Sequence, residues 1–289
     1  MSWSKSTSVL LAVALFFSVG FARQSPLVQP AELQAAKLNP GVVVIDLRPE
    51  EEFLAGHIPG AVNLEPAKLR DGRDRETWIP SPPEIAKIIR PLGVNNDSRV
   101  IAYDDEGGRQ AIRLWFVLGA YGFENVQVLD GGIKSWEREE LELSTEPVRP
   151  GAGDFTPRVT ENWVCPATEF LERDPSVLVI DARSPEEHTG QQATPEAEAG
   201  RVPGSVNVEW KLNLREDGTF KSLDELRELY EGRGITPDKT IIIHCGNGAR
   251  AAHVLFALRM LNYPNVRVYY GSMVDYSARP GVPFERSPN

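Results

Sequence analysis

Three motifs occur twice along the chain in the same order, which indicates two copies of one folding unit. Each copy begins with an apolar run that ends in Asp-x-Arg, continues with Gly-x-[Ile/Val]-Pro-Gly, and then has a second apolar run. The paired segments are residues 42–48 and 177–183, 56–63 and 200–207, and 100–103 and 241–244. A length of 289 residues also suits two ordinary domains. We therefore interpret the chain as an internal duplication.

Within each copy, short β-rich runs alternate with helix-length segments, which predicts βα units around a mainly parallel, buried sheet. The fold class is thus expected to be α/β. Helix starts are indicated at Ser81 and Ser222, because each serine is followed three residues later by glutamate. The Pro- and Gly-rich stretch 147–157 is the predicted linker, with the domain boundary near residue 150. The expected domains are residues 23–149 and 150–289.

Cys245 stands where an apolar run ends and a Gly-Asn-Gly loop leads into a helical pattern. Glycines let backbone N–H groups converge on one point, and the start of a helix adds partial positive charge. Both effects favour a thiolate over a thiol, so Cys245 is the predicted nucleophile. The loop amides are expected to hold the anionic sulfur, and Arg250 to attract an anion. The predicted contacts come from Gly246, Asn247, Gly248, Ala249 and Arg250.

The first copy lacks this chemistry. When the two copies are aligned, Arg109 matches Arg250. The alignment of the loop is ambiguous by one residue, so either Asp104 or Asp105 takes the place of Cys245. A carboxylate cannot act as a sulfur nucleophile, and the acidic loop would repel an anion. The first domain is therefore expected to be catalytically silent, to pack against the second domain and to form one wall of the cleft.

Together these residues resemble the rhodanese family of sulfurtransferases in its tandem-domain form, over nearly all of the chain after residue 30. The resemblance rests on the paired motifs, on Leu-Asp-Gly-Gly at 129–132 and Tyr-Tyr-Gly-Ser at 269–272, and on the single cysteine loop. It implies that Cys245 attacks the outer sulfur of a donor such as thiosulfate and that sulfite leaves. The persulfide that remains then passes its sulfur to cyanide or a thiol, which is ping-pong catalysis. No metal or organic cofactor is implied.

The residues around the loop help to distinguish thiosulfate from 3-mercaptopyruvate as the sulfur donor. Mercaptopyruvate-type members resemble Cys-Gly-Ser-Gly-Val-Thr and tend to carry carboxylate-binding arginines beyond the Asp-x-Arg strand end, where this chain has Glu186, Glu187 and His188. The arginine that ends the loop here resembles single-domain and some bacterial tandem thiosulfate sulfurtransferases. We therefore expect a thiosulfate sulfurtransferase. A 3-mercaptopyruvate sulfurtransferase and a persulfide carrier or interaction module remain as alternatives.

Phosphatase- or arsenate-type chemistry is a minor alternative. Cysteine phosphatases place five residues between the cysteine and the arginine, whereas here residues 246–249 give four. The shorter loop suits a sulfur atom better than a phosphate group.

Two histidines and a second cysteine admit a catalytic or a structural role. His244 is adjacent to the nucleophile, but on a strand its side chain should point away from that of Cys245, so we expect it to pack. His253 can face the domain interface, and an activated thiolate needs no base. Cys165 is expected to be a structural thiol, with no disulfide to Cys245.

Arg183 and Lys211 are the remaining candidate substrate-binding residues. Arg183 ends the second Asp-x-Arg motif near the expected cleft, although the silent copy repeats the pattern, which favours a structural role. Lys211 follows a segment that approaches the active site in the resembling family, although surface lysines are commonly only solvated.

The formal charge of −10 and a pI near 5.1 argue against nucleic acid or an anionic membrane as the main partner. Residues 1–22 predict a signal peptide, because Lys5 is the only charge before an apolar run and Ala22 offers a cleavage site. We expect an exported, periplasmic or extracellular protein without stable membrane insertion after cleavage; an uncleaved anchor is the alternative. The expected partners are a small sulfur donor and a thiol or cyanide acceptor.

Overall fold

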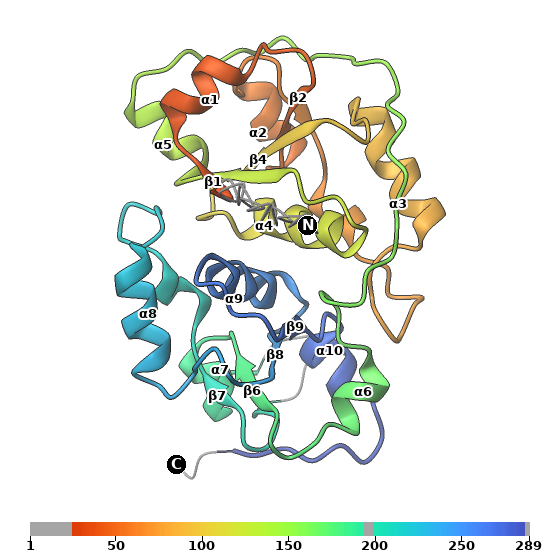
Figure 1. Cartoon of the computed structure of the whole chain (residues 1–289), viewed down its shortest axis with the longest axis vertical. Coiled ribbons are helices and arrows are strands. Elements are labelled where there is room, and N and C mark those ends of the chain that lie inside the picture. Colours follow the sequence, from red (N-terminus) through yellow and green to blue (C-terminus); the bar gives the residue numbers. More distant parts are fainter. Residues whose placement is uncertain (1–24, 194–198, 287–289) are drawn as a thin grey trace, which may run out of the picture.

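The computed structural model describes residues 25–193 and 199–286. The signal peptide predicted for residues 1–22 lies outside them. The described chain forms two bodies, one above the other, each with a sheet flanked by helices (Figure 1). All pairs of named strands are parallel in both sheets. The predicted α/β class with two parallel-sheet domains is therefore confirmed.

The first domain has the strand order β1-β5-β4-β2-β3. Its central strands β2 and β4 pair Asp46 with Tyr103, so both strands end at the same edge of the sheet. The elements are β1 (Leu27–Val28), α1 (Pro30–Ala36), β2 (Val42–Asp46), α2 (Glu50–Ala55), β3 (Val62–Asn63), η1 (Pro66–Leu69), α3 (Pro82–Ile89), η2 (Arg90–Leu92), β4 (Arg99–Tyr103), α4 (Arg109–Ala120), β5 (Val126–Leu129) and α5 (Gly132–Arg138).

The second domain has the order β7-β6-β8-β9, and Val164 adds a parallel bridge to Val268 where the first domain has β1. Strands β6 and β8 pair Asp181 with His244. The elements are α6 (Ala167–Leu171), β6 (Leu178–Asp181), α7 (Pro185–Thr189), β7 (Val206–Asn207), η3 (Trp210–Asn213), α8 (Leu223–Glu231), β8 (Ile241–His244), α9 (Ala249–Met260), β9 (Val266–Val268) and α10 (Ser272–Ser277).

The strand register removes the ambiguity between the two copies. Because Tyr103 and His244 hold equivalent positions, the residue opposite Cys245 is Asp104 and not Asp105. The following helices begin after Gly108 and Gly248, so the first loop is one residue longer. The alignment that paired Arg109 with Arg250 is therefore wrong by one residue.

Serine caps begin three of the helices. The capping boxes predicted at Ser81 and Ser222 are confirmed at the starts of α3 and α8. A third serine box, between Ser184 and Glu187, begins α7 and was not predicted from the sequence. This box fixes Glu187 at the third position of α7.

The chain passes from the first domain to the second through a long segment between α5 and α6 (Figure 1, green). Part of it is bonded to the first domain: Gly153 donates to the carbonyl of Arg90 at 2.8 Å, and Arg158 to that of Tyr121 at 2.9 Å. Phe155 is buried against Phe123. The predicted boundary near residue 150 falls within this segment.

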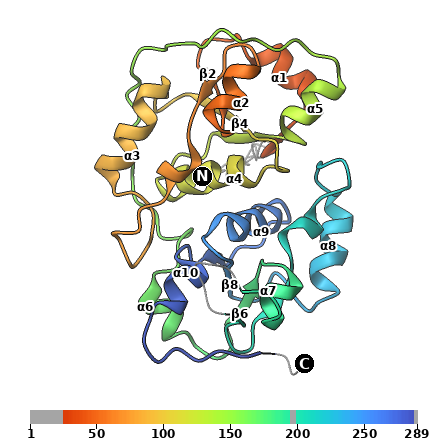
Figure 2. The ribbon, with the colours of Figure 1, turned by 180° about the vertical axis from the view of Figure 1, so that it is seen from behind.

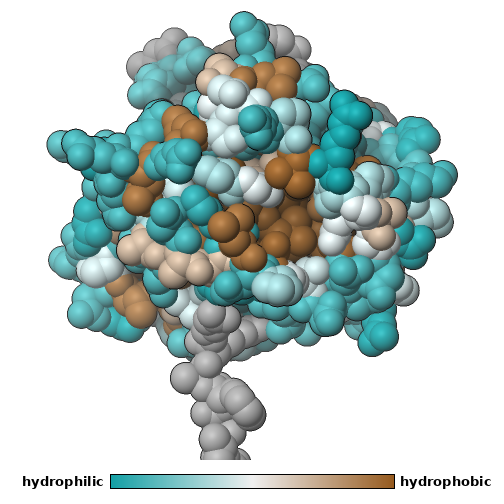
Figure 3. Space-filling view, turned by 90° about the horizontal axis from the view of Figure 1, so that it is seen from above, coloured by the Kyte–Doolittle hydropathy of each residue, from teal (hydrophilic) through white to brown (hydrophobic). Residues whose placement is uncertain are grey.

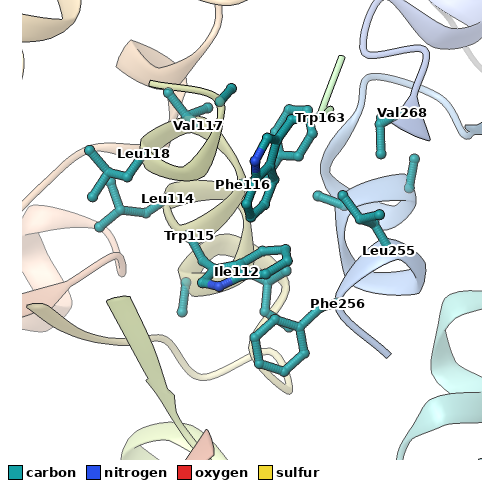
Figure 4. Packing of buried hydrophobic residues seen from close by; sticks show 14 of the residues in the cluster. Ile112, Leu114, Trp115, Phe116, Val117, Leu118, Trp163, Leu255, Phe256 and Val268 are labelled. Carbon is teal, nitrogen blue, oxygen red and sulfur yellow. The ribbon is translucent and has the colours of Figure 1, made fainter. Parts of the chain in front are cut away.

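Helices α4 and α9 lie side by side between the two sheets in both views (Figures 1 and 2). Trp115 of α4 packs edge-on against Phe256 of α9, with ring centroids 4.9 Å apart, and against Trp163 at 4.6 Å (Figure 4). One cluster of buried apolar residues includes side chains of both domains. The two domains are therefore joined by a shared hydrophobic core.

The surface seen from above is mainly hydrophilic, with apolar residues gathered near its centre (Figure 3). Among the residues that the structure describes, no helix combines the length and the apolar character needed to span a membrane.

Candidate active site

Cys245 follows β8 directly, and the loop after it bends back toward the sulfur. The amide of Gly248 donates to the Cys245 sulfur at 3.1 Å. Gly248 has φ +95°, and a Cβ there would lie 2.2 Å from the ring of Tyr270, so this position requires glycine. The Cys245 side chain is fully buried. The loop thus directs a backbone N–H donor at the sulfur, which is the contact expected for stabilising an anionic sulfur at this turn.

The equivalent loop of the first domain binds a carboxyl group through its backbone amides. Asp104 accepts hydrogen bonds from four backbone amides, at 2.6–3.0 Å. Burial raises the pKa of Asp104, and the four amides oppose that rise. An aspartate oxygen and the outer sulfur of a cysteine persulfide both lie two bonds beyond Cβ. The donating amides belong to Glu106, Gly108, Gln110 and Ala111.

Arg250 forms an ion pair instead of projecting freely into the cleft. Its two terminal nitrogens donate to the two carboxylate oxygens of Glu187, at 2.5 and 2.9 Å. Burial opposes the charge on Glu187, which is only 5% exposed, but Arg250 outweighs this effect and lowers the pKa of that carboxyl. Burial likewise opposes the charge on Arg250, while Glu187 and Cys245 raise its pKa above the ordinary value. Glu187 therefore neutralises the charge predicted to attract an anion.

Arg183 does not reach the cleft, contrary to its prediction as a substrate-binding residue. It is 2% exposed and donates to Asp181 at 2.7 Å and to the carbonyl of Gly200 at 2.7 Å. Arg48 makes the same pair of contacts in the first domain, with Asp46 and the carbonyl of Gly56. The Asp-x-Arg motif therefore ties a strand end to the following loop in both copies.

A cavity of about 710 Å³ lies between the domains beside the cysteine loop. The second domain contributes Lys211, Gly246, Asn247 and Arg250. Gly248 and Ala249 are buried and do not line the cavity. The first domain contributes Asp105, Glu106, Gly107, Arg109, Gly131 and Lys134. The cleft therefore has a wall from each domain.

Both histidines near the loop are buried, and burial lowers the pKa of each to about 4. His244 lies against Phe170, and its packing role is confirmed. His253 faces the domain interface, where Nε2 is 3.1 Å from the carbonyl oxygen of Gly107 and Nδ1 is 3.2 Å from the amide nitrogen of Asn213. These contacts suit a neutral ring that donates through Nε2. Neither histidine is placed as a proton acceptor for the thiol.

Cys165 is buried in another part of the second domain, and burial raises its pKa to about 12. Both cysteines are free thiols. Cys165 therefore fits the structural role predicted for it. Within the described ranges, no group of three or more His, Cys, Asp or Glu side chains could hold a metal ion.

Two side chains next to the cysteine loop, Ser272 and Glu187, were not predicted as site residues. Ser272 accepts a hydrogen bond from the backbone of Cys245 at 3.1 Å and lies 4.0 Å from its sulfur. The signal was present, because Ser272 replaces Gly132 of the first copy in otherwise related motifs. For Glu187, the available signal was its capping-box spacing from Ser184, which predicts the start of a helix there.

The chain is thus a tandem α/β protein in which a single cysteine loop follows the carboxyl end of one strand. The family model described as rhodanese-like domain matches residues 29–139 and 167–279. The chain therefore belongs to the rhodanese-like family in its tandem form.

Named relatives narrow the activity. The chain is 36% identical over 240 residues to the 3-mercaptopyruvate sulfurtransferase of Escherichia coli, covering 81% of this chain and 85% of that protein. It is 30% identical over 268 residues to the thiosulfate sulfurtransferase of Azotobacter vinelandii, covering 92% and 98%. It is 32% identical over 291 residues to a sulfur carrier protein of Thermus thermophilus, covering 93% and 99%.

A solved structure gives the same result. The crystal structure of SseA from Escherichia coli, described as a 3-mercaptopyruvate sulfotransferase, superposes with a TM-score of 0.78 at 34% identity, covering 86% of this chain and 98% of that chain. The family and these relatives identify the chain as a sulfurtransferase.

Proposed function

We propose that the chain moves the outer sulfur of thiosulfate to cyanide or a thiol through a persulfide on Cys245. The Cys245 thiolate attacks the outer sulfur, the S–S bond of thiosulfate breaks, and its electron pair leaves with sulfite. The negative charge of the thiolate passes to the outer sulfur of the persulfide. The acceptor then attacks that sulfur, and the Cys245 thiolate is restored. Each half-reaction balances without a metal or an organic cofactor.

The observation that carries this proposal is the anion-binding form of the loop. The Gly248 amide already contacts the Cys245 sulfur at 3.1 Å. In the first domain, the equivalent loop directs four amides at a carboxyl group whose oxygens are the same number of bonds from Cβ as a persulfide's outer sulfur. Counting from the glycines before α4 and α9, Gln110 and Ala111 correspond to Arg250 and Ala251. The amides of Arg250 and Ala251 are therefore our candidates to bind the outer sulfur.

The charges that line the cavity support thiosulfate over a carboxylate donor. Arginine binds carboxylates through two parallel hydrogen bonds, which requires a free guanidinium. The three arginines that line the cavity, Arg109, Arg215 and Arg250, each pair with a glutamate. Lys211 is exposed at the cavity and offers a point charge that suits the sulfonate end of thiosulfate.

Steady-state formation of thiocyanate tests the proposal, with thiosulfate and 3-mercaptopyruvate compared as donors and cyanide as acceptor. Cys245→Ser should abolish turnover, and Cys165→Ala, the matched change at the other buried thiol, should retain it. A larger kcat/KM for thiosulfate supports the donor assignment. A larger kcat/KM for 3-mercaptopyruvate overturns it, and substantial activity in Cys245→Ser overturns the nucleophile.

A persulfide carrier is the second candidate, favoured by the similarity to a named sulfur carrier protein. Mass spectrometry of the protein after incubation with thiosulfate separates the two functions. A carrier would hold one extra sulfur on Cys245 while releasing it to cyanide or small thiols slowly. Rapid loss of that sulfur to cyanide supports the enzyme.

We also propose that the chain is exported, on the evidence of residues 1–22 alone. Expression of the full chain in bacteria, followed by fractionation and N-terminal sequencing, tests this proposal. A mature start near Arg23 in the periplasm supports it. An intact Met1 in the cytosol refutes it.

A further inference from the structure

Arg113 is a first-domain residue that contacts the cysteine loop of the second domain. It lies on α4, is 6% exposed, and donates from Nη2 to the side-chain oxygen of Asn247 at 3.0 Å. Asn247 is two residues after Cys245 and adjacent to Gly248, whose amide contacts the sulfur. A single hydrogen bond thus links the catalytically silent domain to the reactive turn.

The charge of Arg113 is not compensated as it is in other buried arginines. Arg48 and Arg183 each pair with an aspartate of their own motif. Arg113 forms no ion pair with any residue in the described parts of the chain, and its buried Nε has no hydrogen-bond partner there. A buried charge normally requires a partner of opposite sign. The loop beside Arg113 is the place where the proposed reaction keeps a negative charge, first on the thiolate and then on the persulfide.

The other cations near the loop have different surroundings. Glu187 neutralises Arg250, and Arg109, on the first-domain wall of the cavity, pairs with Glu106. Lys211 is exposed, so water screens its charge. Burial raises the pKa of Tyr270, which packs by the loop and therefore stays neutral. Arg113 is thus a buried, unneutralised positive charge at the loop.

We propose that Arg113 is a positioning residue for the active site of the second domain. Through Asn247 it fixes the turn that carries the Gly248 amide, and its charge stabilises the anionic sulfur of Cys245. This inference rests on the proposed function, because it takes Cys245 as the nucleophile. It gives the first domain a part in the reaction beyond packing.

The test measures the reactivity of Cys245 without any sulfur donor. Modification by iodoacetamide is followed from pH 5 to 10 by peptide mass mapping in native protein, Arg113→Gln, Arg113→Lys and Arg99→Gln. Arg99 is the matched control, because it donates to the amide oxygen of Gln127 at 2.7 Å in the same domain, on β4. Thiosulfate kcat and KM and the urea midpoint are measured on the same samples.

For Arg113→Gln, we expect the midpoint of the pH profile to rise by about 0.5–1 pH unit, as loss of a nearby cation predicts. Below the midpoint the modification rate should fall about 3- to 10-fold, because that rate follows the thiolate fraction. Arg113→Lys should restore most of the shift, and Arg99→Gln should match the native profile. The loss in thiosulfate turnover should appear in kcat more than in KM, because Arg113 does not line the cavity.

An unchanged midpoint in Arg113→Gln overturns the proposal, even if the urea midpoint falls, because stability alone would then explain Arg113. An equal shift in Arg99→Gln also overturns it. If Arg113→Gln does not fold, Asn247→Ala removes the hydrogen bond and keeps the charge. We expect it to slow modification with a smaller shift of the midpoint, and a native profile there refutes the positioning role. Failure of thiosulfate turnover in native protein would contradict the proposed function alone.

Discussion

The Arg250–Glu187 pair allows a quantitative prediction about the reactive loop. Replacing Arg250 with alanine leaves the Glu187 carboxylate, 5% exposed, without its cation. Removing one partner of a buried ion pair costs about 3–5 kcal/mol. The Arg250 side chain keeps 21% of its surface accessible to water, so screening reduces the cost, and we expect about 2–3 kcal/mol.

Glu187→Gln is the matching change on the other helix. Glutamine can still accept the capping-box hydrogen bond from the backbone of Ser184, so α7 should keep its start. In the double variant no carboxylate remains buried without a partner. The two changes together should therefore cost about 1–2 kcal/mol less than the sum of the single changes.

Urea unfolding of the four proteins at pH 7 measures this coupling free energy. A coupling below about 0.5 kcal/mol, within the range of additivity, would refute the pair as a stabilising contact. The pH dependence gives a second check. Because Arg250 lowers the pKa of Glu187, the contribution of the pair is fully present above the unfolded value of about 4.3 and is lost as the pH falls through the folded value. Glu187→Gln should remove that part of the acid dependence.

Three further changes test the fold around the site. Trp115→Ala should cost about 3–5 kcal/mol in urea unfolding and lower the transitions of both domains together, because Trp115 lies in their shared core. Asp104→Asn should cost about 1–3 kcal/mol, because an amide NH₂ would face backbone N–H donors; an unchanged urea midpoint would contradict the hydrogen bonding. Burial lowers the pKa of His244 to about 4, so the free energy of unfolding of the native protein should decrease as the pH falls from about 6.5 toward about 4. His244→Gln should make this decrease smaller, and an unchanged decrease would contradict the assignment.

The sequence predicted those features that depend on local pattern. Isoleucines 241–243 with no polar alternation indicated a strand buried on both faces, and β8 occupies this place beside β6 and β9. Serine–glutamate spacing predicted the starts of α3 and α8. The position of the cysteine loop between β8 and α9 was predicted, because a strand end, glycines and a helix start follow one another along the chain.

The partners of charged side chains could not be read from the same pattern. Arg250 and Glu187 are far apart in sequence and meet only when α7 and α9 are packed on one sheet. Arg183 stands at a strand end that faces the expected cleft, but its side chain turns back to Asp181 and Gly200. In both arginines the charge was evident from the sequence, whereas its availability to a substrate depended on tertiary contacts.

The two loops differ in the group that faces their backbone amides. Asp104 is a permanent occupant of the first loop, so that loop has no room for a substrate anion. At the same position in the second domain, Cys245 gains and loses its outer sulfur under the proposed reaction. A domain whose loop is permanently filled can still contribute a cavity wall, a carbonyl contact from Gly107 to His253 and the buried charge of Arg113. The second domain alone would lack all three, so under the proposed function the cysteine loop depends on the duplication even though only one copy carries the thiol.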